Sequence, residues 1–260
     1  MARGLTARPG TVLPPAVRAR SSAGPPGRDF VLVHGLGASS RYFAPLAARL
    51  RRLGTVHVLD LPGFGGAPPP AHRMSVGDLA EAVHRWVTER GLVDPVLVGH
   101  SMGAQVVVEL LVRYPATSSS AVLIGPTVDP AERTAVRQVL RLAQAVLHET
   151  WTVLLTVGSD YLRCGPRWFA RTLRSMLDHP MAERLPAVAA EVLVLRGERD
   201  AVASTRWIEQ AARALPAGRA VVVPSGAHAV MHDHAAQVAD LVGRHTGIAP
   251  GCVPGGDRRG

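Results

Sequence analysis

Three short stretches of the chain carry residue types that could perform nucleophilic catalysis. In residues 96–103 an apolar run breaks into Gly-His-Ser-Met-Gly, which puts Ser101 at the Gly-x-Ser-x-Gly spacing of a nucleophile elbow. Asp200 and His228 each follow a later apolar run. A serine hydroxyl is a weak nucleophile, so it needs an imidazole to take its proton and a carboxylate to orient that imidazole. The three side chains could therefore transfer acyl groups if the fold brings them together.

The residues around Ser101 have a steric explanation. A serine at the apex of a strand, a tight turn and a helix must adopt a strained backbone conformation so that its Oγ stands clear of the sheet. Gly99 and Gly103 remove side chains that would collide with the incoming strand and the outgoing helix. The expected helix 104–114 would direct free N–H groups at negative charge that develops nearby.

A second glycine-rich turn could supply another N–H donor. The apolar run 30–33 ends in His-Gly-Leu-Gly, and glycines directly after a buried strand let the backbone approach a ligand closely. We expect the backbone N–H groups of Leu36 and Met102 to form an oxyanion hole. The alternative is that residues 34–37 are only a loop between a strand and a helix.

The elements that must position these residues alternate along the chain. Short apolar runs separated by amphipathic helical patterns predict an α/β fold with a doubly wound, mostly parallel sheet. Parallel strands end at one edge of the sheet, so Ser101, Asp200 and His228 should emerge together. The helix expected at 75–90 starts with a capping box of Ser75 and Asp78. The expected strands are 30–33, 55–59, 93–98, 121–124, 192–195 and 220–223.

The alternation stops between residues 127 and 186, where only helical patterns remain. We expect a helical cap there, inserted into a core formed by 29–126 and 187–246, and we expect it to contact substrate. A purely structural helical layer is the alternative. The first cap helix should begin at Asp129, and its apolar face comprises Val136, Leu140, Ala143 and Leu147. Two further apolar segments follow at 151–157 and 168–177.

Both ends of the chain lack a core pattern. Residues 1–28 are rich in Pro, Gly, Ala and Arg and are expected to form a flexible arm, within which 16–20 could add a short edge strand. Residues 247–260 are expected to form a disordered tail. The first residues show no secretory signal pattern, which favours a cytoplasmic location.

The composition argues against several classes of protein. The net charge of +9 comes from 29 basic residues that are all arginine, and the chain has neither Lys nor Asn. This bias indicates a GC-rich genome, and the scattered arginines argue against nucleic-acid binding. No apolar run reaches the length of about 18 residues that a membrane span needs. Cys164 and Cys252 form neither a disulfide framework nor a metal cluster, so we expect no metal and no cofactor.

Five motifs follow one another along the chain: His-Gly-Leu-Gly, Asp-Leu-Pro-Gly-Phe-Gly, Gly-His-Ser-Met-Gly, Arg-Gly-Glu-Arg-Asp and Ser-Gly-Ala-His. Together they resemble the α/β-hydrolase fold family with a helical cap. The resemblance covers about residues 29–245 and implies that Ser101 is the nucleophile, His228 the general base and acid, and Asp200 its orienting partner. It also implies the Leu36 and Met102 amides as the oxyanion hole. The family's amino-terminal strands are weak or missing here, so a sheet with fewer strands is expected.

Several neighbouring residues compete for these roles. Asp129 follows another strand and is kept as a backup for Asp200, and His232 and His234 are weaker candidates than His228. We expect solvated positions for these two histidines. Asp60 and Glu198 are expected to hold loops through hydrogen bonds. His100 is interpreted as a buried hydrogen-bonding residue without a catalytic step.

The resulting hypothesis is a serine hydrolase that acts on a small or medium apolar acyl substrate. The bond could belong to an ester, a thioester, a lactone or an activated carbon–carbon compound. An acyltransferase with the same triad and a ligand-binding protein without catalysis are the alternatives. A dehalogenase or epoxide hydrolase is disfavoured because those relatives carry an aspartate at the elbow. The sequence does not predict the oligomeric state.

Overall fold

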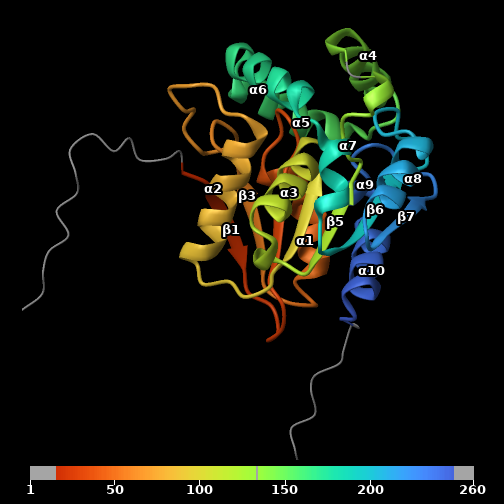
Figure 1. The fold of residues 1–260 in the computed structure, drawn as a ribbon. Coiled ribbons are helices and arrows are strands. Elements are labelled where there is room, and N and C mark those ends of the chain that lie inside the picture. The colour runs from red at the N-terminus through yellow and green to blue at the C-terminus, as the bar shows by residue number, and fades with distance from the viewer. Residues whose placement is uncertain (1–15, 133, 249–260) are drawn as a thin grey trace, which may run out of the picture.

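The computed structural model describes residues 16–132 and 134–248, which form a seven-stranded sheet between two layers of helices (Figure 1). The strand order is β1-β3-β2-β4-β5-β6-β7, and every pair is parallel except β1 with β3. The predicted doubly wound, mostly parallel sheet is therefore confirmed. The strands are β1 Arg18–Ser22, β2 Phe30–Val33, β3 Val56–Asp60, β4 Val96–His100, β5 Ser120–Ile124, β6 Glu191–Gly197 and β7 Gly218–Val223.

Each face of the sheet has its own apolar core. In β2, Phe30 and Leu32 pack on one face while Val31 and Val33 pack on the other, because successive side chains of a strand alternate between faces. Helices cover both faces, so the central strands are buried on both sides and read as continuous apolar runs. The first face is covered by α1 Ala44–Leu50, α9 Val230–Asp233 and α10 Ala235–Thr246, and the second by α2 Val76–Glu89, α3 Met102–Arg113 and α8 Thr205–Ala214.

The edge strand β1 lies within the expected arm, close to the short edge strand that the sequence allows at 16–20. Residues 18–22 pair antiparallel with β3, so this part of the expected arm 1–28 belongs to the sheet. The signal was weak because the strand is mostly exposed and carries two arginines. With β1 the sheet has seven strands. Residues 1–15 of the expected arm, and 249–260 of the expected tail with Cys252, lie outside the described residues.

The segment between β5 and β6 is helical, as the sequence indicates. It contains α4 Ala135–Val146, α5 Trp151–Cys164, α6 Pro166–Asp178 and the short α7 Met181–Arg184. The helices α4, α5 and α6 lie beyond one end of the strands of the sheet (Figure 1). We call these three helices, with the turns that join them, the cap.

The first cap helix begins later than the sequence predicts. Asp129 caps a single turn of 3-10 helix, Pro130–Glu132, in which its carboxylate accepts the Ala131 N–H at 3.0 Å. The α-helix starts after Thr134, whose side chain accepts the N–H of Arg137 at 3.3 Å. Elsewhere the capping prediction is confirmed, because Ser75 and Asp78 form the expected reciprocal box at the start of α2.

Among the described residues no helix is long and apolar enough to cross a membrane. In the same part of the chain, no group of three or more His, Cys, Asp or Glu residues is placed to hold a metal ion.

Candidate active site

The turn between β4 and α3 holds Ser101 in a conformation that few residues adopt. Its backbone has φ 55° and ψ −119°, and its N–H donates to the Ile124 carbonyl at 2.9 Å. A Cβ on Gly99 would lie 2.4 Å from the Gly103 carbonyl oxygen. A Cβ on Gly103 would lie 2.1 Å from the Val33 carbonyl oxygen on β2. Both glycines are therefore required sterically, and the strain is concentrated at the residue with the candidate nucleophile.

His228 and Asp200 meet at the carboxyl edge of the sheet. The His228 Nδ1–H donates to Asp200 Oδ2 at 2.9 Å, so Nε2 is left free to accept a proton. The other carboxylate oxygen, Oδ1, accepts the N–H groups of Val202 at 2.8 Å and Ala203 at 3.1 Å. A Cβ on Gly125 would lie 3.0 Å from both members of the pair, so the glycine leaves the space that the pair occupies.

The electrostatics favour an ionised Asp200 and a basic His228. Burial opposes the charge on His228, but the Asp200 carboxylate and its hydrogen bond outweigh burial and raise the pKa of the imidazole. Burial also opposes the charge on Asp200, but the imidazole and the backbone donors outweigh it and lower the pKa of the carboxyl. This is the arrangement in which an imidazole can take up a proton while its partner remains an anion.

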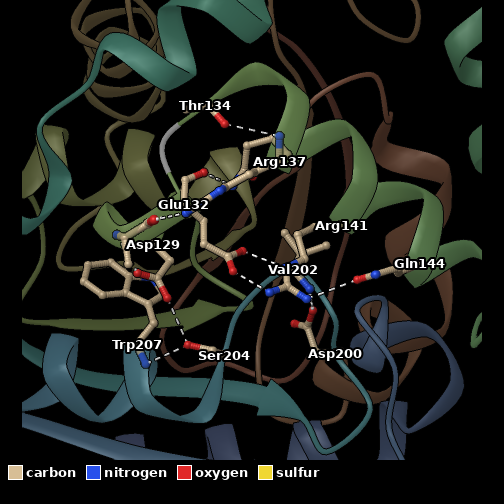
Figure 2. Close-up of polar contacts among 12 residues, drawn as sticks. Asp129, Glu132, Thr134, Arg137, Arg141, Gln144, Asp200, Val202, Ser204 and Trp207 are labelled. Carbon is tan, nitrogen blue, oxygen red and sulfur yellow. Dashed lines mark hydrogen bonds and ion pairs between the residues drawn. The ribbon is translucent and has the colours of Figure 1, made fainter.

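Asp129, the alternative acid, points elsewhere. Its second carboxylate oxygen accepts the Ser204 hydroxyl at 3.0 Å, on the side of α8 (Figure 2). Glu132 next to it pairs with Arg141 of α4 (Figure 2). The structure therefore brings Asp200 and not Asp129 to His228, a choice that the sequence left open.

The other competing residues take the positions that the sequence suggests. His232 pairs with Asp233 at 2.8 Å, and His232 and His234 border a separate surface hollow beside α1. Asp60 accepts the Ser40 N–H at 2.6 Å, and Glu198 accepts the Ser225 N–H at 2.8 Å, so both acids hold loops.

Ser101 and His228 line one cavity of about 400 Å³ beneath the cap. Within the described residues no hydrogen bond joins the Ser101 hydroxyl to His228, a bond that in many unliganded enzymes tightens only when substrate binds. The remaining wall is mostly aliphatic and aromatic, with the main contribution from the cap. Cap residues on this wall include Leu142, Val146, Val153, Leu154, Val157, Phe169 and Leu173.

The loop after β2 has two N–H groups that differ in whether they are available to a ligand. The Gly35 N–H donates to the Tyr42 hydroxyl at 2.9 Å, so it is not available to a ligand. Leu36 lines the cavity, and among the described residues neither its N–H nor that of Met102 donates a hydrogen bond. Met102 occupies the first turn of α3, where N–H groups have no partner in the helix. Both expected oxyanion donors are therefore free.

His100 is a buried hydrogen-bonding residue, as the sequence suggests, and its partners, which the sequence did not reveal, link this loop to His228. Its Nε2–H donates to the His228 carbonyl at 3.0 Å, so its Nδ1 accepts from the Tyr42 hydroxyl at 2.7 Å. Burial and the neighbouring His228 lower the pKa of His100 to about 3. A neutral His100 thus completes a chain from the Gly35 N–H through Tyr42 to His228. The only sequence signal was the buried position of His100, because Tyr42 comes from a distant segment.

Glu149, between α4 and α5, makes a second contact near His228 that could not be predicted from the sequence. Its carboxylate accepts the Ala229 N–H at 2.8 Å, next to His228, and the residue lines the cavity. Burial raises the pKa of this carboxyl. The cap therefore contacts the backbone of the residue that follows the candidate base.

Several contacts hold the cap to the core, and three of them lie over the loops after β2 and β3. The Asp160 carboxylate on α5 accepts the Ser39 hydroxyl at 2.6 Å and pairs with Arg41 at 2.5 Å. The Tyr161 ring covers Gly37, where a Cβ would lie 2.1 Å from the ring. The Trp168 ring covers Gly63 in the same way, at 2.1 Å from its Nε1. The cap thus rests on the loops after β2 and β3.

Comparisons with known proteins agree with this architecture. The model of the alpha/beta hydrolase family matches residues 30–241. Abhydrolase domain-containing protein abhd-5.2 of Caenorhabditis elegans is 30% identical over 100 residues, which cover 37% of this chain and 22% of that protein. An uncharacterized protein of Mycobacterium tuberculosis is 30% identical over 213 residues, which cover 80% of this chain and 65% of that protein. The chain thus spans less than two thirds of these relatives.

Solved structures show the same fold. A thermophilic esterase from Thermogutta terrifontis superimposes with a TM-score of 0.76 at 20% identity, covering 88% of this chain and 92% of the esterase. At this sequence identity the similarity shows the fold and does not identify a substrate.

Proposed function

The chain belongs to the alpha/beta hydrolase family, and on that premise we propose that it is a serine hydrolase that cleaves an ester or a related acyl bond through an acyl-enzyme on Ser101. One observation carries the proposal. His228 is hydrogen-bonded to Asp200 at 2.9 Å, and His228 lines the same cavity as Ser101, which stands on a strained turn. A buried acid and base beside a serine at a helix start are the parts that nucleophilic acyl transfer needs.

In the first half of the proposed reaction, Ser101 Oγ attacks the carbonyl carbon of the substrate while His228 Nε2 takes the hydroxyl proton. Asp200 stabilises the imidazolium and fixes its tautomer. The carbonyl oxygen becomes negative and accepts hydrogen bonds from the Leu36 and Met102 N–H groups. The loss of one such donor typically costs about 3–4 kcal/mol of transition-state stabilisation. His228 then gives its proton to the leaving alcohol, which leaves Ser101 acylated.

In the second half, a water molecule loses a proton to His228 and attacks the acyl carbonyl. The tetrahedral intermediate collapses, Ser101 recovers its proton from His228, and the carboxylic acid leaves. The mostly aliphatic wall of the cavity supports an apolar acyl chain as the bound part of the substrate. The same steps apply to a thioester or lactone, because the attacked atom is again an acyl carbon.

The experiment that tests the proposal is intact-mass analysis after incubation with a fluorophosphonate. We expect one adduct on the wild-type chain and none on Ser101→Ala. A panel of nitrophenyl esters of increasing acyl length then measures turnover, and Ser101→Ala should reduce kcat by about 10⁴-fold or more. A folded wild-type protein that neither reacts with the probe nor hydrolyses any ester would overturn the proposal in favour of a ligand-binding protein.

A further inference from the structure

The outer surface of the cap carries most of the exposed apolar surface in the described part of the chain. Nine large hydrophobic side chains are exposed among the described residues, and seven of them come from α4, α5 and the turn between these helices. The other two, Val93 and Val222, lie outside the cap. Contiguous apolar surface of this kind usually marks a site of interaction.

The two helices expose this surface as matching stripes. On α4 and the turn after it, Val136, Leu140 and Leu147 are 70%, 57% and 80% exposed. Leu140 and Leu147 follow Val136 by four and eleven positions. Residues at these spacings lie on one side of a helix, so these three form a line. The same spacing recurs on α5 with Trp151, Leu155 and Leu162, which are 79%, 71% and 86% exposed. We call these six residues the apolar stripes.

The apolar stripes and the cavity of the candidate active site lie on opposite sides of the same two helices. The opposite sides of α4 and α5 line that cavity with Leu142, Val153 and Leu154. Val146 belongs to both surfaces, because it lines the cavity and is still 45% exposed. The cap is therefore a thin apolar layer between the surroundings and Ser101.

A row of arginines lies on the next helix. Arg167, Arg171 and Arg174 follow each other on α6 at intervals of four and three residues, and all three are exposed. Among the described residues, Arg167 and Arg171 have no ion-pair partner, and Arg174 approaches Asp178 only at 3.9 Å. The helix α6 packs against α5, where Tyr161 meets Phe169 with ring centroids 5.3 Å apart. The exposed apolar stripes and the two arginines without an ion-pair partner in the described part of the chain thus lie on neighbouring helices of the cap.

We propose that the outer face of the cap docks on an anionic lipid surface. The apolar stripes enter the boundary between headgroups and acyl chains, and the arginines of α6 bind the lipid phosphates. Leu and Trp side chains beside arginines are the composition of helices that lie in a membrane interface. Charge distinguishes this partner from a second copy of the chain. Two copies of this face would bring their arginine rows together, whereas anionic headgroups neutralise them.

Docking also identifies a class of substrate, a step that rests on the function proposed above. A lipid surface presents amphiphilic esters with aliphatic acyl chains. The cavity has a matching aliphatic wall, and both the half-exposed Val146 and Ser101 line it. An amphiphilic acyl ester could therefore pass from the membrane to the serine along an apolar path.

The experiment measures binding of the full chain to vesicles without turnover. Ser101→Ala is mixed with sucrose-loaded vesicles of phosphatidylcholine, with or without a third of phosphatidylglycerol, and the bound fraction is sedimented. We expect strong binding only to the anionic vesicles, weakened by high salt. Trp151 reports the contact directly, because the other three tryptophans are at most 7% exposed. Its emission should shift to the blue and lose its quenching by iodide.

Three variants locate the binding face. Leu147→Ser with Leu155→Ser should weaken binding by about tenfold or more, because two leucines no longer leave water. Arg167→Gln with Arg171→Gln should weaken binding to the anionic vesicles by about tenfold or more, since each charge near such a surface contributes about fivefold. Val93→Ser is the matched control, because Val93 is 84% exposed but lies outside the cap, and it should bind as the parent does.

Three results would overturn the docking proposal. These are no binding of the parent to anionic vesicles, an equal response of the leucine pair and Val93→Ser, and a dimer in sedimentation velocity that the leucine pair abolishes. The last would identify a second copy as the occupant. None depends on catalysis, so vesicle binding without any ester hydrolysis would refute the proposed function and leave the docking intact.

Discussion

The sheet and the cap fix their polar groups in different ways. At the carboxyl edge of the sheet, Asp200 is held by His228 and by two backbone N–H groups, and His100 ties His228 to the loop after β2. In the first cap helix the strong contacts are local, such as the pair of Glu132 and Arg141 (Figure 2). The difference teaches that the sheet edge sets the chemistry, while the helices that cover it set what can reach it.

The largest effect on activity is expected from a change to Asp200, the acid at the sheet edge. Asp200→Asn should lower kcat by about 10⁴-fold, because the amide no longer stabilises the imidazolium or its tautomer. Asp129→Asn is the matched control, since its contacts are the Ala131 N–H and the Ser204 hydroxyl, and its kcat should stay close to the wild-type value. Steady-state ester hydrolysis measures both. Equal losses in the two variants would contradict the assignment of Asp200.

The next effect concerns the connection through His100. His100→Ala leaves the Tyr42 hydroxyl and the His228 carbonyl without their partner, so we expect kcat to fall by about 10- to 100-fold. His100→Gln retains a donor and an acceptor and should recover part of the loss. Because the pKa of His100 is about 3, the pH profile of the glutamine variant should keep the wild-type acid limb. A shifted limb would instead mean that His100 exchanges protons during turnover.

The pH dependence follows from the pair at the sheet edge. Asp200 raises the pKa of His228, and His228 must be neutral to act as the base. Activity is therefore present above the raised pKa and falls about tenfold per pH unit below it, with the acid limb above the ordinary histidine pKa of about 6.5. The profile of kcat/KM measures the limb. In Asp200→Asn the residual activity should show a limb at lower pH, and an unmoved limb would argue against this coupling.

A smaller effect is expected where the cap is tied to the core. Asp160 is 1% exposed and accepts hydrogen bonds from Ser39 and Arg41. Asp160→Asn keeps the shape but removes the charge, so the free energy of unfolding should fall by about 1–2 kcal/mol. KM should rise more than kcat falls, because Asp160 makes no contact with the triad. Urea denaturation and steady-state kinetics measure the two changes.

The smallest effect compares the two sides of α5. Leu155→Ser changes an exposed position, so the free energy of unfolding should stay within about 0.5 kcal/mol of wild type. Val153→Ala removes buried methyl groups from the cavity wall and should cost about 1–2 kcal/mol. Thermal denaturation compares them. A large loss from Leu155→Ser would show that the outer face is packed in the folded chain.

The central strands and the order of the motifs could be predicted because a strand that is buried on both faces consists almost entirely of apolar residues. Runs such as 30–33 and 121–124 are apolar at every position, and turns with required glycines follow them. The sequence pattern of β1 is weaker, since its side chains are mostly exposed and its position depends on pairing with β3.

The cap was predicted in outline but not in orientation. Periodicity shows that Val136, Leu140 and Leu147 share one side of a helix, but it does not tell whether that side faces a core. In the structure these three side chains are exposed, whereas Ala143, which the same pattern includes, lines the cavity. The acid was left open for a similar reason, because Asp129 and Asp200 both follow strands and only the geometry distinguishes them.

The two aromatic contacts between cap and core have a consequence for building chimeras from members of this family. The rings of Tyr161 and Trp168 occupy the space where side chains at positions 37 and 63 would begin. A transplanted cap with rings at these places therefore needs a recipient with glycine at both positions. A cap without them would leave two uncovered gaps over the loops after β2 and β3. Cap exchange should succeed when these four positions are transferred together, as one inherited unit.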